Sequence, residues 1–152
     1  IGDSSNSSGF EAANSADEVA FIVPVAVYDE HGQKLAPPAD LAAWFKARTD
    51  LTATSSPVQL GSAKGTLVVG TLSATAHTNT AGGVNVLCAN GYTKCNFEEG
   101  GQIGFLPGTR FEFLFATVAG KQIVFEADAP PADWATVGPA FDAFLRSIRF
   151  PG

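Results

Sequence analysis

The sequence predicts an α+β fold in which an antiparallel β-sheet carries two amphipathic helices packed on one face. Two observations predict it. Strand-like runs follow one another with turn residues between them, and two other segments carry apolar residues at helical spacing. Of the 152 residues, 45% are hydrophobic and 16% are charged, a composition that can bury the core of one domain and argues against disorder.

The N-terminal composition, the net charge and the longest apolar run indicate which kinds of protein this chain can be. Residues 1–16 are small, polar and rich in Ser, so we expect a flexible lead-in, with one α+β domain over residues 17–152. The chain contains no Met, so we expect a processed product that has lost a signal or anchor segment, or an excised fragment. The net charge of −6 argues against a nucleic-acid partner. The longest apolar run, residues 19–28, is about half as long as a membrane span requires.

The part of the domain up to Cys88 is expected to contain a strand, a helix and three further strands. "DEVAFIVPVAVY" (17–28) reads as one strand, followed by a turn over residues 29–32 and a short return. A helix is predicted in "PPADLAAWFKARTD", because apolar residues and one arginine share a face: Leu41, Trp44, Phe45 and Arg48. Strands are then predicted in "SPVQLG", "GTLVVGTLSATAH" and "VNVLC".

The strongest local pattern is the hairpin "TRFEFLFATVAGKQIVFEADAP" (109–130). A three-residue loop over 118–120, with Gly120 in the left-handed conformation, pairs Phe113 with Phe125. One face of the hairpin then carries a ladder of Phe side chains that belongs in the core. The opposite face is expected to be exposed to solvent.

That opposite face contains the candidate binding residues. In the same register Arg110 pairs with Asp128, and Glu112 lies directly opposite Glu126. Two facing carboxylates repel each other unless another group lies between or beside them. We interpret the four residues as an exposed face with an ordinary salt bridge. A ligand or cation site formed by Arg110, Glu112, Glu126 and Asp128 is the alternative, and general acid–base chemistry is a weaker one.

The C-terminal segment is expected to form the second helix. Its apolar residues recur at helical spacing: Val137, Phe141, Phe144, Leu145 and Ile148. Pro139 follows Gly138 and suits the start of a helix. A short strand is expected over residues 147–150.

Both cysteines lie in "CANGYTKC" (88–95), and four roles compete for them. A structural zinc site needs four ligands, and a thioredoxin-like pair needs only two intervening residues. Two free thiols are a further alternative. A disulfide between Cys88 and Cys95 is favoured, because a four-residue turn beginning at Asn90-Gly91 brings the two residues face to face across a hairpin. Such a bond persists in an oxidising compartment.

The order of these segments resembles that of a known class of domains. "VYDEHGQKLAPPADLAAWFKARTDL", "SPVQLGSAKGTLVVGT", the cysteine-containing turn and "FLFATVAGKQIVFEADAP" are similar to a secreted or lipoprotein-type domain of high-GC Gram-positive bacteria and their relatives. The resemblance implies a PsbP/DcrB-like α+β sandwich. Such domains often carry "HPDL" after the first helix, where this chain has residues 48–51. The resemblance assigns no functional residues.

The sequence contains no hydrolase, metalloprotease or nucleotide-binding motif. We therefore expect a non-enzymatic extracellular or cell-surface domain that acts in binding or assembly, with an unidentified protein or small molecule as its partner and no cofactor. Two alternatives stay open. One is a carrier of a small apolar ligand between sheet and helices, and the other is an enzyme that uses the Glu112/Glu126 face.

Overall fold

The computed structural model describes residues 10–11, 18–90, 95–98, 103–148 and 150. The predicted lead-in therefore lies almost wholly outside the described residues. In chain order the elements are β1 (Phe10–Glu11), β2 (Glu18–Ile22), β3 (Pro24–Tyr28), β4 (Lys34–Leu35), α1 (Leu41–Lys46), β5 (Leu51–Leu60), β6 (Ala63–Leu72), β7 (Val84–Ala89), β8 (Ile103–Phe105), β9 (Arg110–Val118), β10 (Lys121–Ala129) and α2 (Trp134–Ser147).

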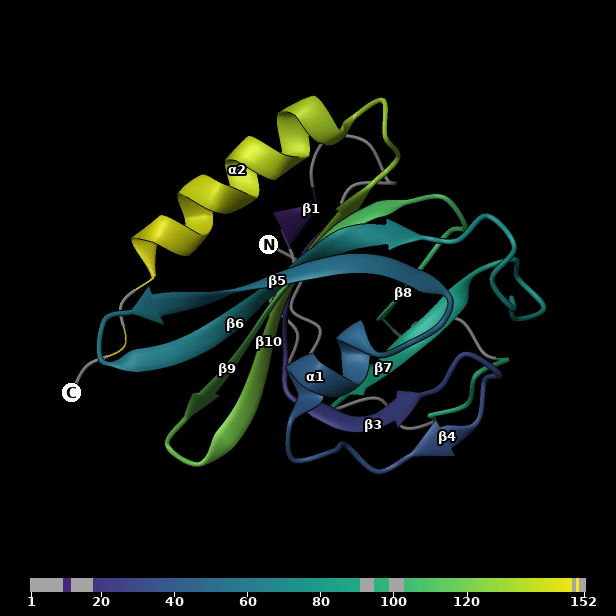
Figure 1. The fold of residues 1–152 in the computed structure, drawn as a ribbon, viewed down its shortest axis with the longest axis horizontal. Helices are drawn as coiled ribbons and strands as arrows, with labels where there is room; N and C mark the ends of the chain where they lie inside the picture. Colours follow the sequence, from purple (N-terminus) through teal and green to yellow (C-terminus); the bar gives the residue numbers. More distant parts are fainter. Residues whose placement is uncertain (1–9, 12–17, 91–94, 99–102, 149, 151–152) are drawn as a thin grey trace.

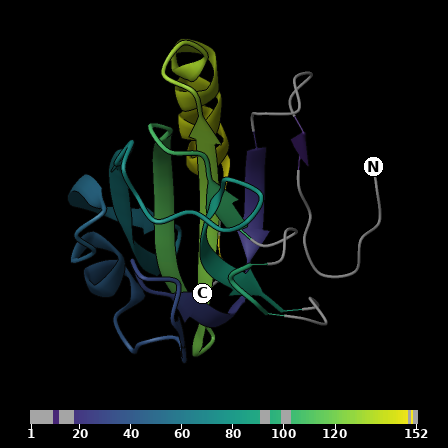
Figure 2. The same ribbon diagram turned by 90° about the vertical axis from the view of Figure 1, so that its right-hand side faces the viewer.

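The strands form two antiparallel sheets, which confirms the predicted α+β class. The larger sheet has six strands in the order β1-β2-β10-β9-β6-β5, and the smaller has four in the order β4-β3-β7-β8. The long β5–β6 and β9–β10 hairpins of the larger sheet cross the molecule beneath α2, and the smaller sheet lies on the other side with α1 (Figure 1). The view turned by 90° shows the strands of the larger sheet side by side, with β2 and β1 on the side away from β5 and α1 (Figure 2).

The first predicted strand is in fact two strands that belong to different sheets. β2 pairs with β10 in the larger sheet, whereas β3 pairs with β7 in the smaller one. The break lies at Val23, directly before Pro24, which has no N–H to donate to a ladder, and the β3–β7 register shifts between Pro24 and Ala26. This short segment therefore connects the two sheets directly.

One face of the larger sheet packs on the smaller sheet and on α1, and phenylalanine rings fill the space between them. Phe45 of α1 contacts Phe111, Phe113 and Phe115 of β9, with ring centroids 4.6–5.4 Å apart. Phe105 of β8 stacks on Phe111 at 5.5 Å. The β9 part of the predicted Phe ladder is thus the centre of this core, whereas Phe125, which the prediction placed on the same face, lies on the other one.

The opposite face of the larger sheet is covered by α2, so two predictions about it are wrong. The two helices lie on opposite faces, and the face behind the Phe ladder is not exposed to solvent. Leu114 of β9 is 0% exposed and Phe125 of β10 is 6% exposed. Both belong to a second apolar cluster with Phe141 and Leu145 of α2. The apolar stripe of α2 needs a surface to cover, and this face supplies it.

α2 begins earlier than predicted, at Trp134 rather than at Pro139. Pro139 lies inside the helix, where its missing N–H costs one intrahelical hydrogen bond. Gly138 is buried against the indole of Trp134, and a Cβ atom there would lie 2.9 Å from Trp134 Nε1. Glycine therefore allows the ring to lie against its own helix.

A buried ion pair follows α1, which ends at Lys46 and leaves Arg48 outside the helix. Arg48 donates from Nε to Asp50 Oδ1 at 2.9 Å and from Nη2 to Asp50 Oδ2 at 2.6 Å. Its Nη1 donates to the carbonyl of Tyr28 in β3. This two-pronged geometry satisfies both charges inside the protein and connects the segment after α1 to the smaller sheet.

The β9–β10 hairpin has a two-residue turn instead of the predicted three-residue loop. Ala119 and Gly120 both have positive φ angles, 50° and 76°, which is typical of a type I′ turn. Val118 therefore pairs with Lys121, and Phe113 pairs with Glu126 rather than with Phe125. Because side chains alternate along a strand, this shift of one residue moves every β10 side chain to the other face.

Both faces of the larger sheet are covered, so we expect two neighbouring residues of β9 to contribute about equally to stability. We expect Phe113→Ala to lower the free energy of unfolding by about 3–5 kcal/mol and Leu114→Ala by about 2–5 kcal/mol, measured by urea denaturation. Leu106→Ala is the matched control, because Leu106 is 59% exposed. A loss for Leu114→Ala as small as that of the control would mean that α2 does not cover this face.

Candidate functional site

The corrected register separates the four residues that the sequence brought together. Arg110 and Glu112 lie on the face covered by α2, where Glu112 pairs with Ala127 and Arg110 pairs with Ala129. Glu126 and Asp128 lie on the Phe face, opposite Phe113 and Phe111. The predicted contact between Glu112 and Glu126 is therefore wrong, and the four side chains do not form one site.

Glu126 and Asp128 are enclosed in the protein. Glu126 is 1% exposed and ranks among the largest fully buried side chains, and Asp128 is 9% exposed. Their strand lies between β9 and β2 in the middle of the larger sheet. A dissolved ligand cannot reach Glu126 without an opening of the two layers.

Glu112 is the polar residue in the apolar layer beneath α2. It is 9% exposed, and its backbone lies between Val69 of β6 and Ala127 of β10. Its Oε2 atom is buried and has no hydrogen-bond partner within the described part of the chain. Arg110, two residues earlier on the same face, is exposed, and its guanidinium lies 5.3 Å from the ring centroid of Trp134.

The surroundings of Glu112 favour its protonated form. The pKa of Glu112 is raised from 4.5 to about 7, mainly by burial and in addition by the negative charge of Asp142 on α2. The positive charge of Arg110 acts in the opposite direction on this pKa. The carboxyl therefore exchanges its proton near neutral pH.

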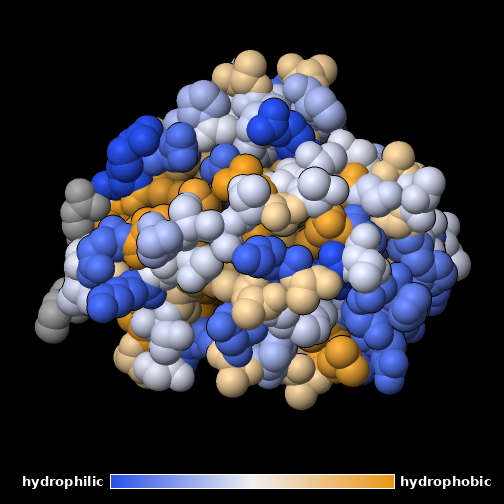
Figure 3. All heavy atoms as spheres, in the orientation of Figure 1, coloured by the Kyte–Doolittle hydropathy of each residue, from blue (hydrophilic) through white to orange (hydrophobic). Residues whose placement is uncertain are grey.

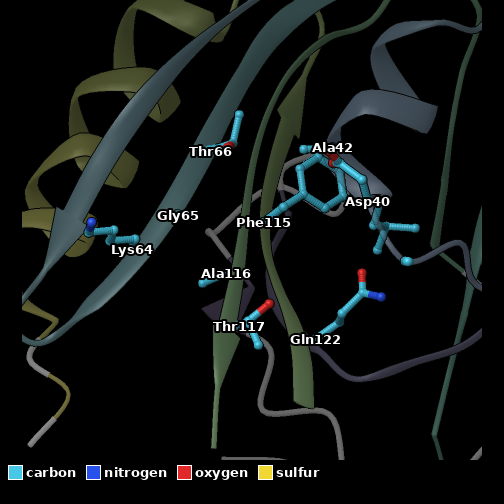
Figure 4. Close-up of a pocket in the computed structure, with 11 residues that line it drawn as sticks. Asp40, Ala42, Lys64, Gly65, Thr66, Phe115, Ala116, Thr117 and Gln122 are labelled. Carbon is cyan, nitrogen blue, oxygen red and sulfur yellow. The ribbon is translucent and has the colours of Figure 1, made fainter. Parts of the chain in front are cut away.

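A separate pocket of about 300 Å³ lies between the start of α1 and the end of the β9–β10 hairpin (Figure 4). Phe115 lines it, together with Asp40 and Gln122 on one side and Lys64 on the other. Asp40 already accepts the N–H of Ala43 at 2.9 Å, and Gln122 Nε2 already donates to a backbone carbonyl at 2.8 Å. Its walls come from segments far apart in the chain, so no sequence pattern indicated it.

The two histidines do not form a catalytic arrangement with the described residues around them. His31 lies in the turn after β3, where its backbone N–H donates to Asp29 Oδ1 at 2.9 Å. The His77 ring stacks on Phe97, 5.4 Å between centroids. Within the described ranges, no group of three or more His, Cys, Asp and Glu side chains could hold a metal ion.

A disulfide joins Cys88 and Cys95, whose Cα atoms are 5.7 Å apart, as predicted. Cys88 is buried in β7. Cys95 is not in a strand, and β7 pairs with β3 and β8, so the predicted hairpin across the two cysteines is wrong. The remainder of the predicted turn, residues 91–94, lies outside the described residues.

The outer edge of the larger sheet is formed by β5, a strand of ten residues. The side chains from Thr54 to Pro57 are all exposed, and the strand contains no charged residue. On the α2 side of this edge, hydrophobic surface is visible between α2 and the β5–β6 hairpin (Figure 3). The partly buried residues that pack onto the α2 cluster include Val58 and Leu67 of this hairpin and Phe144 of α2.

The comparisons with known proteins assign the chain to no family. No protein-family model and no curated protein matches the chain. Among solved structures, the chain is similar to PA94, a protein of unknown function from Pseudomonas aeruginosa, with 12% identity and a TM-score of 0.49. The match covers all of this chain and 87% of the other. None of the helices formed by the described residues is long and apolar enough to cross a membrane.

The raised pKa of Glu112 predicts a pH-dependent effect of its neutral analogue. The folded state holds this proton more tightly than the unfolded chain, so the native carboxyl lowers stability progressively as the pH rises from about 4.5 to about 7. We expect Glu112→Gln to leave the free energy of unfolding nearly unchanged at pH 4 and to raise it by on the order of 1–3 kcal/mol above pH 7.

Urea denaturation across this pH range measures the effect. Glu30→Gln, in the turn after β3, is the control for loss of a negative charge elsewhere on the protein. A loss of stability in Glu112→Gln at high pH would contradict the prediction, and would mean that the ionised carboxylate is bound to a cation or held by Arg110.

Proposed function

We propose that this chain is a non-enzymatic domain that works outside the cytoplasm, at a bacterial surface or secreted, and acts in binding or assembly. The exposed edge of β5 carries this proposal. A free strand edge presents a row of backbone donors and acceptors, and extended segments of other proteins bind such edges by adding a strand. The partly buried apolar side chains beside it offer contacts for the side chains of an added strand.

The disulfide supports a location outside the cytoplasm. Such bonds persist in oxidising compartments and are rare where thiols are kept reduced. Cys88–Cys95 joins the buried strand β7 to the segment that follows it. We also propose that the fold is related to the PsbP/DcrB-like sandwich, because the order of its elements follows that pattern.

The alternative of an enzyme that uses Glu112 and Glu126 is poorly supported. The two carboxylates lie on opposite faces of the sheet, and Glu126 is enclosed. General acid–base catalysis requires both groups within reach of the same substrate atoms. The backbone of the sheet separates them.

The alternative of an apolar-ligand carrier is also less well supported than binding at the edge. A carrier needs a cavity between sheet and helices. In this protein the space between α1 and β9 is occupied by the rings of Phe45, Phe111, Phe113 and Phe115 in direct contact. In the pocket beside Phe115, the side chains of Asp40 and Gln122 are already hydrogen-bonded within the protein.

Selection from a library of displayed extended peptides, followed by hydrogen-exchange mass spectrometry, tests this function. We expect the selected peptides to protect the backbone amides of β5 from exchange, because a strand added at the edge hydrogen-bonds to them. The amides of β8, at the edge of the other sheet, are the internal control and should be unaffected.

Two results would contradict the proposal. Protection of backbone amides at the start of α1 and at the end of the β9–β10 hairpin would show that the peptides bind at the pocket. Turnover in a broad panel of hydrolase substrates, abolished by substitution of one polar residue, would make the protein an enzyme.

A further inference from the structure

The two sheets end in four edge strands, and they differ greatly in length. β1 and β4 contain two residues each and β8 contains three, whereas β5 contains ten. A strand pair is stabilised by cross-strand contacts along its length, so short edges offer little to a partner. Among the described strands, β5 is the edge that can support an extended new pairing.

The part of β5 before Pro57 has none of the charged residues that commonly prevent an edge strand from pairing with another strand. Natural edge strands commonly carry charged residues, especially Lys, which disfavour the approach of a second strand. Leu51–Leu60 carries none in a chain with a net charge of −6. Lys46 reaches this strand from α1, where its Nζ donates to Ser55 Oγ at 3.3 Å.

The C-terminal end of β5 already takes part in added strand pairing. Phe150 forms a parallel bridge with Gly61: its N–H donates to the carbonyl of Leu60 at 3.4 Å, and its carbonyl accepts from Ser62 N at 3.3 Å. Of the short strand expected over 147–150, the described residues show this bridge at Phe150, and Ser147 belongs to α2. Pro57, which has no N–H, separates this end from the rest of the edge. Residues 51–56 form the open stretch.

The residues of this open stretch can pair with the same residues of a second copy of the chain. We propose that two copies of the chain pair antiparallel through β5, across a twofold axis at Thr54, and form a dimer with one continuous sheet. The proposal rests on the proposed function, because it names a second copy of this chain as the partner of the same edge. A twofold contact brings the same strand of each copy together, so the strand must tolerate itself as a neighbour.

In this register Thr54 faces Thr54 of the second copy, and Thr52 faces Ser56. These residues share the α2 face of the sheet, since Thr54 pairs with Val69 and Val69 pairs with Glu112. Opposed Thr–Thr and Thr–Ser pairs can hydrogen-bond across strands, whereas opposed like charges would repel. The third pair, Ala53 with Ser55, is also small and neutral. The pairs formed by residues 52–56 are therefore compatible with self-association, and Leu51 faces Pro57, where the new pairing ends because proline has no N–H.

Sedimentation equilibrium of the full chain tests the dimer directly. We expect the wild-type protein to show a reversible monomer–dimer equilibrium. Thr54→Lys and Thr54→Glu should each weaken the dimer at least roughly tenfold, about 1.4 kcal/mol, because each places two like charges at the twofold axis. An equimolar mixture of the two variants should recover a dimer, since Lys then faces Glu.

Thr117→Lys is the matched control, because Thr117 is an exposed residue of β9, which β6 separates from the β5 edge, and this variant should dimerise like the wild type. Thermal unfolding of each variant checks that the fold is retained. A wild-type protein that stays monomeric at high concentration would overturn the proposal, as would a dimer that Thr54→Lys and Thr54→Glu leave unchanged. A monomer whose β5 amides are protected by selected peptides would overturn self-pairing alone and leave the proposed function standing.

Discussion

Positive φ angles at Ala119 and Gly120 close the β9–β10 hairpin with a two-residue turn, and the arrangement of the whole protein depends on the register that this turn sets. β9 and β10 lie in the middle of the six-stranded sheet, so their side chains form both buried layers. The register directs Phe111, Phe113 and Phe115 to the smaller sheet, and Leu114 and Phe125 to α2. A shift of one residue would exchange the two faces of β10, and would place Glu126 rather than Phe125 beneath α2.

The same register explains the charged residues of the core. Glu126 and Asp128 lie between the two sheets. Glu112 lies on the other face, in the apolar layer beneath α2, where the charges of Asp142 and Arg110 act on it. Burial of a carboxyl disfavours its ionised form, so the pKa of Glu112 rises to about 7. The layer beneath α2 is consequently the part of the protein whose stability responds to pH near neutrality. The exposed edge at β5 is formed from the same sheet but carries no charge.

Much of the fold could be predicted from the sequence, because strand alternation and helical spacing are local patterns. The α+β class, the Phe face of β9 and the disulfide followed from such patterns, and the structure confirms them. The turn could not be predicted in this way, because alanine rarely adopts a positive φ. A three-residue loop with only Gly120 in the left-handed conformation therefore agreed better with the local sequence. The single strand expected over residues 17–28 and the helix start expected at Pro139 were wrong for a similar reason. Tertiary packing divides that segment between two sheets, and it places Pro139 within a helix. Glu112 was singled out for a contact with Glu126 that does not exist, and the β5 edge and the pocket depend on strand order, which no local pattern encodes.

Cross-strand NOEs between β9 and β10 test the register most directly, because protons of paired residues lie close together in an antiparallel sheet. The structure predicts backbone contacts between Phe113 and Glu126 and between Leu114 and Phe125. Contacts of Phe113 with Phe125 and of Glu112 with Glu126 would instead establish the three-residue loop. That result would return the two carboxylates to one face, and would contradict the account of both buried layers.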